Sequence, residues 1–362
     1  MKNKVYIGYS EVATLISIMI GTKAFLGYPR LVTQLGMTAG WIIVFFSGLI
    51  SLCLWLLISS FLACFPKKSL TAITESTFGS IIGTVLNIVV FTFSILVISN
   101  SLRIFSEVVI ITALTETPVI VLTLVFILAA WIAAYYGIEA ISRSAYISFP
   151  FIIASVIAVL ILLYPYYDFK QITPIWGSGI LSIGKNSFLG ISAFGEVILL
   201  CYIIHYFQFD VKKVKQAGAF SIILVTIFFA AIVIVYQMVL PVPTSIETLV
   251  PFYQLSRSIN LGHYFQRVES IFVMFWIFTA FLRLSMGLFV STIIFQDTLK
   301  LPYYRPLLPA ICLLVFSLSL TPADMMQTVM YEDIKFNYGW LVTFVLPLFI
   351  LVVALILKRK EE

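Results

Sequence analysis

Charged residues are scarce in this chain. Asp, Glu, Lys and Arg make up 10% of its 362 residues, whereas 61% are hydrophobic and the mean hydropathy is +1.09. A soluble globular domain carries roughly 25% charged residues, so the composition excludes a soluble fold and predicts an integral membrane protein. The net charge of +6 would suggest a nucleic-acid partner in a soluble protein. Here it indicates Lys and Arg gathered in cytoplasmic loops, and no nucleic acid is expected.

Residues that carry metal and catalytic chemistry are also rare. The chain has two histidines, and its four cysteines all fall in apolar segments without C-x-x-C spacing. We therefore interpret the cysteines as small buried hydrophobes and expect neither a metal site nor a cofactor. There is no HExxH motif, nucleophile elbow or phosphate-binding glycine loop, so an enzyme is not expected.

Apolar runs of membrane-crossing length, about 20 residues each, are abundant. They predict an all-α integral membrane protein with ten transmembrane helices in a single polytopic domain over residues 1–362. The predicted spans are Ser10–Leu35, Trp41–Phe65, Ile81–Leu114, Val119–Tyr136, Ala145–Tyr164, Ser187–Phe209, Gly218–Leu240, Val268–Phe295, Pro306–Leu320 and Trp340–Leu357. The third is longer than one crossing needs, so it is expected to tilt or to extend beyond the membrane.

The distribution of Lys and Arg orients these spans. With the N-terminus inside, 13 of these residues fall on the inner side and 5 on the outer side. This asymmetry predicts that both termini are cytoplasmic, and the first run is read as a retained span. The longest loops, Pro165–Asn186, Pro241–Gln266 and Thr321–Gly339, are then external, as lids, docking surfaces or ordinary connections.

Glycines interrupt the first and sixth spans. The first contains Gly21-Thr22-Lys23, and the sixth contains Gly190-Ile191-Ser192-Ala193-Phe194-Gly195-Glu196. Broken helices at equivalent places in two halves predict an inverted repeat, about 10–164 and 187–357, with a binding site at the breaks. Backbone groups freed there would hold the charged groups of a ligand, and an α-amino acid carries both charges. Alternatively, the glycines only permit close helix packing.

Two ionisable residues lie inside these breaks and need partners in lipid. Lys23 either takes the place of a sodium ion, so that coupling is to protons or absent, or forms a structural ion pair with Glu196 or Glu107. Glu196 either binds the ammonium of a ligand or pairs with Lys23.

Further polar residues mark the third and eighth spans. Arg103 and Glu107 have i, i+4 spacing and are expected to form a local ion pair. Deeper in the third span, Ser99 and Asn100 are candidates for a binding pocket. In the eighth span, Thr279 and Arg283 are candidates for the pocket lining, with Arg283 reaching the inner headgroups as the alternative.

The order of these motifs resembles the amino acid–polyamine–organocation (APC) transporter superfamily. The residues that carry the likeness are the Ile-Gly-Thr and proline of SEVATLISIMIGTKAFLGYP and the Gly-x-Ser-x-Phe-Gly of the sixth span. The whole chain resembles more closely one branch, the spore germination permease family, which comprises the B subunits of germinant receptors. The most specific stretch is PFYQLSRSINLGHYFQRVESIFVMFW.

The resemblance implies a five-plus-five APC-like repeat with broken helices 1 and 6. It also implies a receptor in the inner membrane of the spore that binds a small germinant, an amino acid or a sugar. An A subunit and a lipoprotein C subunit would be its partners. Arg267 and Glu269 match the family's Arg-x-Glu pattern and are expected to form an external gate, a subunit contact or a structural salt bridge. The alternative function is a proton-coupled secondary amino acid transporter.

Overall fold

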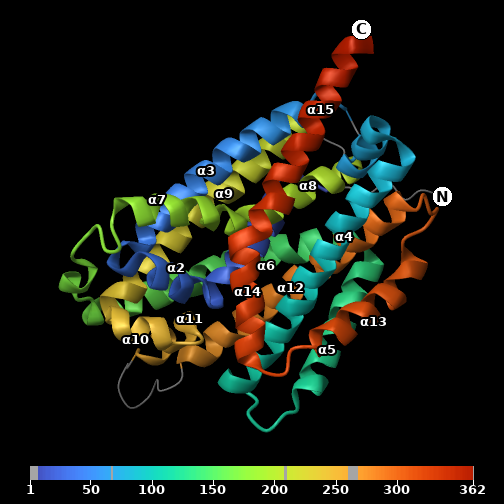
Figure 1. The fold of residues 1–362 in the computed structure, drawn as a ribbon. Coiled ribbons are helices and arrows are strands. Elements are labelled where there is room, and N and C mark those ends of the chain that lie inside the picture. The colour runs from blue at the N-terminus through green and yellow to red at the C-terminus, as the bar shows by residue number, and fades with distance from the viewer. Residues whose placement is uncertain (1–6, 67, 208–209, 260–267, 362) are drawn as a thin grey trace.

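The chain folds into a bundle of helices (Figure 1). The computed structural model describes residues 7–66, 68–207, 210–259 and 268–361, and these residues form helices and connections without a strand. Backbone N–H and C=O groups in lipid have no water to bind, so an open chain would leave them unsatisfied, and helices satisfy them within the segment. The predicted all-helical membrane architecture is confirmed.

The first half of the chain forms six longer helices and several short ones. They are α1 (Tyr9–Gly21), η1 (Thr22–Phe25), α2 (Tyr28–Gly36), η2 (Met37–Ala39), α3 (Gly40–Leu62), α4 (Leu70–Thr112), α5 (Val119–Tyr136), α6 (Ile138–Leu162), η3 (Tyr164–Tyr166) and η4 (Phe169–Ile172).

The second half contains the elements that follow. They are α7 (Ile180–Leu189), η5 (Gly190–Ile198), α8 (Leu199–Tyr202), η6 (Ile204–Tyr206), α9 (Val211–Val239), α10 (Val242–Glu247), α11 (Pro251–Arg257), α12 (Val268–Thr298), η7 (Arg305–Leu307), α13 (Leu308–Ser319), α14 (Met325–Trp340), η8 (Leu341–Val345) and α15 (Leu346–Glu361).

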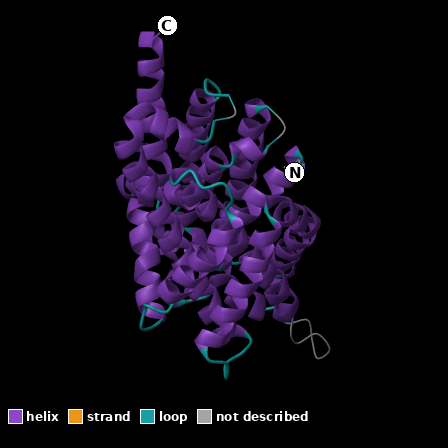
Figure 2. Cartoon of the chain, turned by 90° about the vertical axis from the view of Figure 1, so that its right-hand side faces the viewer, coloured by secondary structure: helices purple, strands orange, loops and turns teal. Residues whose placement is uncertain are grey.

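Eight helices of the described chain are long and apolar enough to cross a membrane, and Arg305–Ser319 is a shorter apolar helix. The count of ten crossings therefore stays a prediction. The described chain begins and ends toward the same end of the bundle (Figure 2), as an even number of crossings requires.

Helices α3 and α9 lie side by side (Figure 1) and approach closely at two glycines. A Cβ atom at Gly48 would lie 2.0 Å from the Thr226 hydroxyl oxygen, and one at Gly218 would lie 2.4 Å from the Trp55 ring. The Trp55 indole Nε1 also donates to the Lys215 carbonyl at 2.9 Å. Small residues let backbones come close enough for van der Waals contact, which drives helix association in lipid.

The predicted third span is the longest helix, α4, with 43 residues. Gly79 interrupts it with φ +78° and ψ 174°, a conformation that glycine adopts without a steric penalty. The helix is therefore kinked, and Leu70–Phe78 form a separate segment ahead of the long span. The expected extension beyond one crossing is thus a kinked helix segment.

The stretch Thr321–Gly339 differs from its prediction as an external loop. Most of it is the helix α14, which continues through the π-helical turn η8 into α15. Its polar residues Glu332, Asp333 and Lys335 are half-buried and line cavities of the bundle. Together α14, η8 and α15 form a long rod whose C-terminal end projects beyond the rest of the bundle (Figures 1 and 2).

Candidate functional site

Both predicted breaks are present. In the first span α1 ends at Gly21, a 3₁₀ turn follows, and Leu26 is extended before α2 begins at Tyr28. In the sixth span the nine residues Gly190–Ile198 form a 3₁₀ helix between α7 and α8. This sixth-span segment is a tightened helix instead of the open backbone that the glycines suggested. Such long 3₁₀ runs are uncommon and often mark functional hinges.

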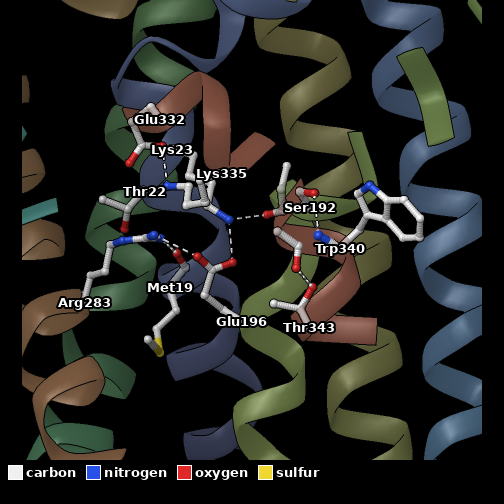
Figure 3. A network of polar contacts seen from close by, with 12 residues as sticks. Met19, Thr22, Lys23, Ser192, Glu196, Arg283, Glu332, Lys335, Trp340 and Thr343 are labelled. Carbon is white, nitrogen blue, oxygen red and sulfur yellow. Dashed lines mark hydrogen bonds and ion pairs between the residues drawn. The ribbon is translucent and has the colours of Figure 1, made fainter. Parts of the chain in front are cut away.

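Glu196 joins the two breaks to α12 (Figure 3). Its Oε2 atom lies 2.5 Å from Lys23 Nζ, and its Oε1 atom lies 2.7 Å from Arg283 Nη2. Lys23 and Arg283 are 6% and 5% exposed, so both cations are buried. Glu196 is therefore shared by two cations, which keeps each of them paired away from water.

Backbone carbonyls at the breaks complete this arrangement. Lys23 Nζ donates to the Ala193 carbonyl at 2.5 Å, and Arg283 Nη1 donates to the Met19 carbonyl at 2.5 Å. These two carbonyls, which a bound cation could otherwise use, are thus occupied by side chains of this chain. The ion pair expected between Lys23 and Glu196 is present, and Arg283 joins it.

Helix α14 adds two charges that the sequence did not place here. Lys335 forms an ion pair with Glu332, three residues earlier, and both side chains lie close to Lys23 (Figure 3). The Ser192 hydroxyl of the broken sixth span accepts from the Trp340 backbone N–H at 2.9 Å. We call Lys23, Glu196, Arg283, Glu332 and Lys335 the ion cluster. Three cations face two carboxylates in it, so one positive charge remains in excess.

A cavity with mostly hydrophobic walls adjoins the ion cluster, with an empty volume of about 830 Å³ including its open side. Glu196, Arg283 and Lys335 lie at its wall, together with Ser192 and Ser101. We call it the apolar cavity, and its hydrophobic walls include Val90, Phe93, Ile98, Leu199, Leu284 and Val342. Charges at the wall and hydrocarbon elsewhere suit a ligand with one charged and one apolar end.

The glycines and Phe194 of the predicted site are packing residues in this structure. A Cβ atom at Gly190 would lie 2.2 Å from the Ser47 hydroxyl, and one at Gly195 would lie 2.7 Å from Thr343 Cγ2. Phe194 is fully buried. The close-packing alternative thus holds at Gly190 and Gly195, beside a break that is also present.

Other predicted residues lie away from the ion cluster. Gly21, Thr22 and Thr279 line a separate cavity between α1, α6 and α9. Ser99 and Asn100 line another between α4, α13 and α14, where Asn100 Nδ2 donates to the Thr328 carbonyl at 3.3 Å and to Glu332 at 3.2 Å.

The remaining charged predictions fall into two groups. Arg103 Nε and Glu107 Oε1 are 2.5 Å apart and both residues are buried, so the expected local pair is present. Arg267 lies outside the described residues, as does the side chain of Glu269. Their role as a gate or subunit contact stays a prediction.

The fold defines the class of protein. It is similar to the structure of Mhp1, a nucleobase-cation-symport-1 family transporter solved in a closed conformation with bromovinylhydantoin bound. That likeness has a TM-score of 0.68 at 12% identity and covers 94% of this chain and 79% of that one. It is also similar to MhsT in complex with L-phenylalanine, with a TM-score of 0.67 at 15% identity over 97% and 89% of the two chains. The chain therefore has the fold of APC-type transporters, with broken first and sixth spans.

The family follows from sequence comparison. The family model described as spore germination protein matches residues 6–328, and the chain belongs to this family. It is 24% identical over 359 residues to spore germination protein B2 of Bacillus subtilis (strain 168), covering 97% of this chain and 96% of that one. Spore germination protein A2 of the same organism is 26% identical over 97% and 96% of the two chains. The predicted resemblance is confirmed, and the chain is a membrane protein of germinant-receptor or permease type.

Proposed function

We propose that this chain is the membrane subunit of a germinant receptor and that it binds a small nutrient beside the ion cluster to trigger germination. One observation carries the proposal: two broken helices meet at Glu196, next to the apolar cavity, in a chain of the germination family. In transporters of related architecture, broken helices form the ligand site.

The chemistry of this site favours an amino acid with an apolar side chain over a sugar. The positive charge in excess in the ion cluster attracts a carboxylate, and buried charges act strongly because little water screens them. Of the predicted ligand-binding residues, Ser192, Gly195, Glu196 and Arg283 line the apolar cavity. Arg283 would attract the ligand carboxylate, and Glu196 would hold the Arg283 guanidinium in place. The hydrophobic walls would surround the ligand side chain.

The setting of the receptor is part of the proposal. We place the chain as one polytopic domain in the inner membrane of the spore with both termini cytoplasmic, in two repeats of about 10–164 and 187–357. An A-type subunit and a lipoprotein C-type subunit would be its partners. The relatives named as germination proteins support this placement.

The test uses spores that carry the chain in place of their own copy, exposed to single amino acids and to sugars. We expect germination, measured as loss of optical density, with at least one apolar amino acid. Ser101→Leu fills the apolar cavity and Arg283→Gln removes the carboxylate-attracting charge, so both variants should lose the response. Gly184→Leu is the control, because Gly184 is exposed and a Cβ atom there meets nothing within 4 Å.

An immunoblot of spore membranes checks that each variant is present at the level of the wild-type chain. A normal response by Ser101→Leu and Arg283→Gln at that level would refute the site. A response to a sugar alone would refute the carboxylate assignment while keeping the receptor.

The second candidate function is a proton-coupled secondary amino acid transporter. It is favoured by the likeness to Mhp1, a symport-family transporter, and by Lys23, whose ammonium binds the Ala193 carbonyl as a bound cation would. Purified chain in liposomes distinguishes the two: a transporter accumulates labelled amino acid under a pH gradient. A receptor without transport activity binds the amino acid but does not accumulate it.

A further inference from the structure

A second cavity lies on the other side of the ion cluster. We call it the polar cavity; it has an empty volume of about 730 Å³ including its open side, and Gly27, Tyr28, Arg30, Ile104 and Asp333 line it. On α4 the apolar cavity is lined between Val90 and Ser101, whereas the polar cavity is lined by Ile104 and Val108, nearer the Thr112 end. The two cavities share Ser192 and Lys335, so the ion cluster separates them.

Two residues that line the polar cavity each carry a polar atom with no hydrogen-bond partner among the described residues. Tyr28 is 6% exposed, and its buried hydroxyl makes no hydrogen bond within the described chain. The Nε atom of Arg30 is likewise buried without an acceptor among the described residues. An unsatisfied buried polar group costs about 1–3 kcal/mol, so such groups in a native protein call for an explanation. A ligand that accepts both hydrogen bonds would remove that cost, and binding it requires a small movement of the side chains that cover these two atoms.

A carboxylate is also present on the same wall. Among the described residues Asp333 makes neither an ion pair nor a side-chain hydrogen bond, in contrast to its neighbour Glu332, which pairs with Lys335. Arg30 and Asp333 therefore offer one cation and one anion to the same cavity from two different helices, α2 and α14. The helix α2 begins at this cavity with no side-chain cap, so its dipole adds a positive end next to Tyr28.

We propose that the polar cavity is a second ligand site, which binds a free α-amino acid by its zwitterionic backbone. The Tyr28 hydroxyl and Arg30 Nε–H donate to the ligand carboxylate, and the Asp333 carboxylate accepts from the ligand ammonium. The apolar residues Ile104, Val108, Leu249 and Val329, which share this cavity, surround the side chain. An anion alone would add a second negative charge beside Asp333, and a cation alone would leave the Tyr28 hydroxyl and Arg30 Nε without acceptors.

Gly27 permits a precise test. It lines the polar cavity, its backbone has an ordinary φ of −71°, and a Cβ atom there would meet nothing within 4 Å. Gly27→Leu therefore fills the cavity without straining the backbone. Arg30→Gln removes the carboxylate partner by an independent route. Gly184→Leu serves again as the matched control outside both cavities.

The experiment measures binding of each of the twenty amino acids by isothermal titration calorimetry to the full chain in lipid nanodiscs. It uses the Ser101→Leu background, so that the apolar cavity is filled and binding in the polar cavity is read separately from the proposed germinant site. We expect at least one amino acid to bind. Adding Gly27→Leu should abolish that binding, and adding Arg30→Gln should weaken it about tenfold or more. Gly184→Leu should leave it unchanged.

Analogues of the amino acid that binds identify the ligand class. The analogue without the amino group and the analogue without the carboxylate should each bind about tenfold more weakly or worse. Equal binding of the deaminated acid, or displacement by inorganic phosphate, would overturn the zwitterion site in favour of an anion site. Failure of every amino acid to bind Ser101→Leu, or binding that survives Gly27→Leu, would overturn the proposal outright.

Discussion

Removal of the Glu196 carboxylate should destabilise this protein more than removal of either cation that it binds. Glu196→Gln leaves both Lys23 and Arg283 buried without their counterion, whereas Lys23→Met leaves Glu196 still paired with Arg283 Nη2 at 2.7 Å. Breaking a buried pair so that a charge is left unpaired costs about 3–5 kcal/mol. Losing one of two charged hydrogen bonds costs about 1.5–3 kcal/mol. The asymmetry follows from one acid being shared by two bases.

The double variant sharpens this expectation. In Lys23→Met with Glu196→Gln, only Arg283 keeps a buried charge without a carboxylate, so the double variant should be more stable than Glu196→Gln alone. The coupling free energy between the two positions would then be clearly non-additive, as expected for residues in one ion network.

The assay is equilibrium unfolding of the purified full-length chain in mixed micelles of increasing dodecyl sulfate content, followed by far-ultraviolet circular dichroism. It gives the free energy of unfolding for the wild type, both single variants and the double variant. Equal destabilisation by the two single variants would show that Arg283 does not share Glu196. Additive effects in the double variant would show that Lys23 and Glu196 are not a pair.

Three further predictions use the same unfolding assay. Arg103→Met leaves the buried Glu107 without its partner and should cost about 3–5 kcal/mol. Gly79→Ala forces a Cβ-bearing residue to φ +78° and ψ 174°, which should cost about 1–3 kcal/mol. Gly218→Ala places a Cβ atom 2.4 Å from the Trp55 ring, and the overpacking should cost about 1–3 kcal/mol.

Matched variants control these three. Gly184→Ala adds the same methyl group at an exposed helical position with open space around it, and it should be neutral or slightly stabilising. Gly79→Ala or Gly218→Ala as stable as Gly184→Ala would contradict the kink or the close helix contact. Arg103→Met combined with Glu107→Leu should recover most of the lost stability, because no unpaired charge remains.

The sequence predicts the breaks for a physical reason, and it offers an ion pair of Lys23 with Glu196 or Glu107 as one of two alternatives. Glycines and an ionisable residue inside an apolar run are costly in lipid, so their coincidence marks a constrained place. The sequence could not predict which acid pairs with Lys23, because Glu107 and Glu196 both lie in apolar segments of the chain. Only the packing of the sixth span against the first brings Glu196 within reach of both Lys23 and Arg283.

The charged residues that α14 adds to the ion cluster could not be predicted, because the polar composition of this segment is typical of a solvated loop. A helix that presents Glu332, Asp333 and Lys335 to internal cavities has the same composition as an exposed connection. Ser99 and Asn100 were predicted to line the binding pocket, but they line a different cavity from Ser101. They lie one or two residues from Ser101, and each residue turns a helix by about 100°, so they face a different cavity.

The rod formed by α14, η8 and α15 connects the ion cluster to the C-terminal end of the described chain. Lys335 lies in α14, and the rod continues through α15, which packs against α3 and α4, to a C-terminal end that projects beyond the bundle. At 1.5 Å per residue, the part of the rod after Lys335 is about 39 Å long. The π-helical turn Leu341–Val345 interrupts this rod between Lys335 and α15, and π-helical turns are frequent at functional sites. The ion cluster and the C-terminal end of the described chain therefore lie on one continuous helical rod.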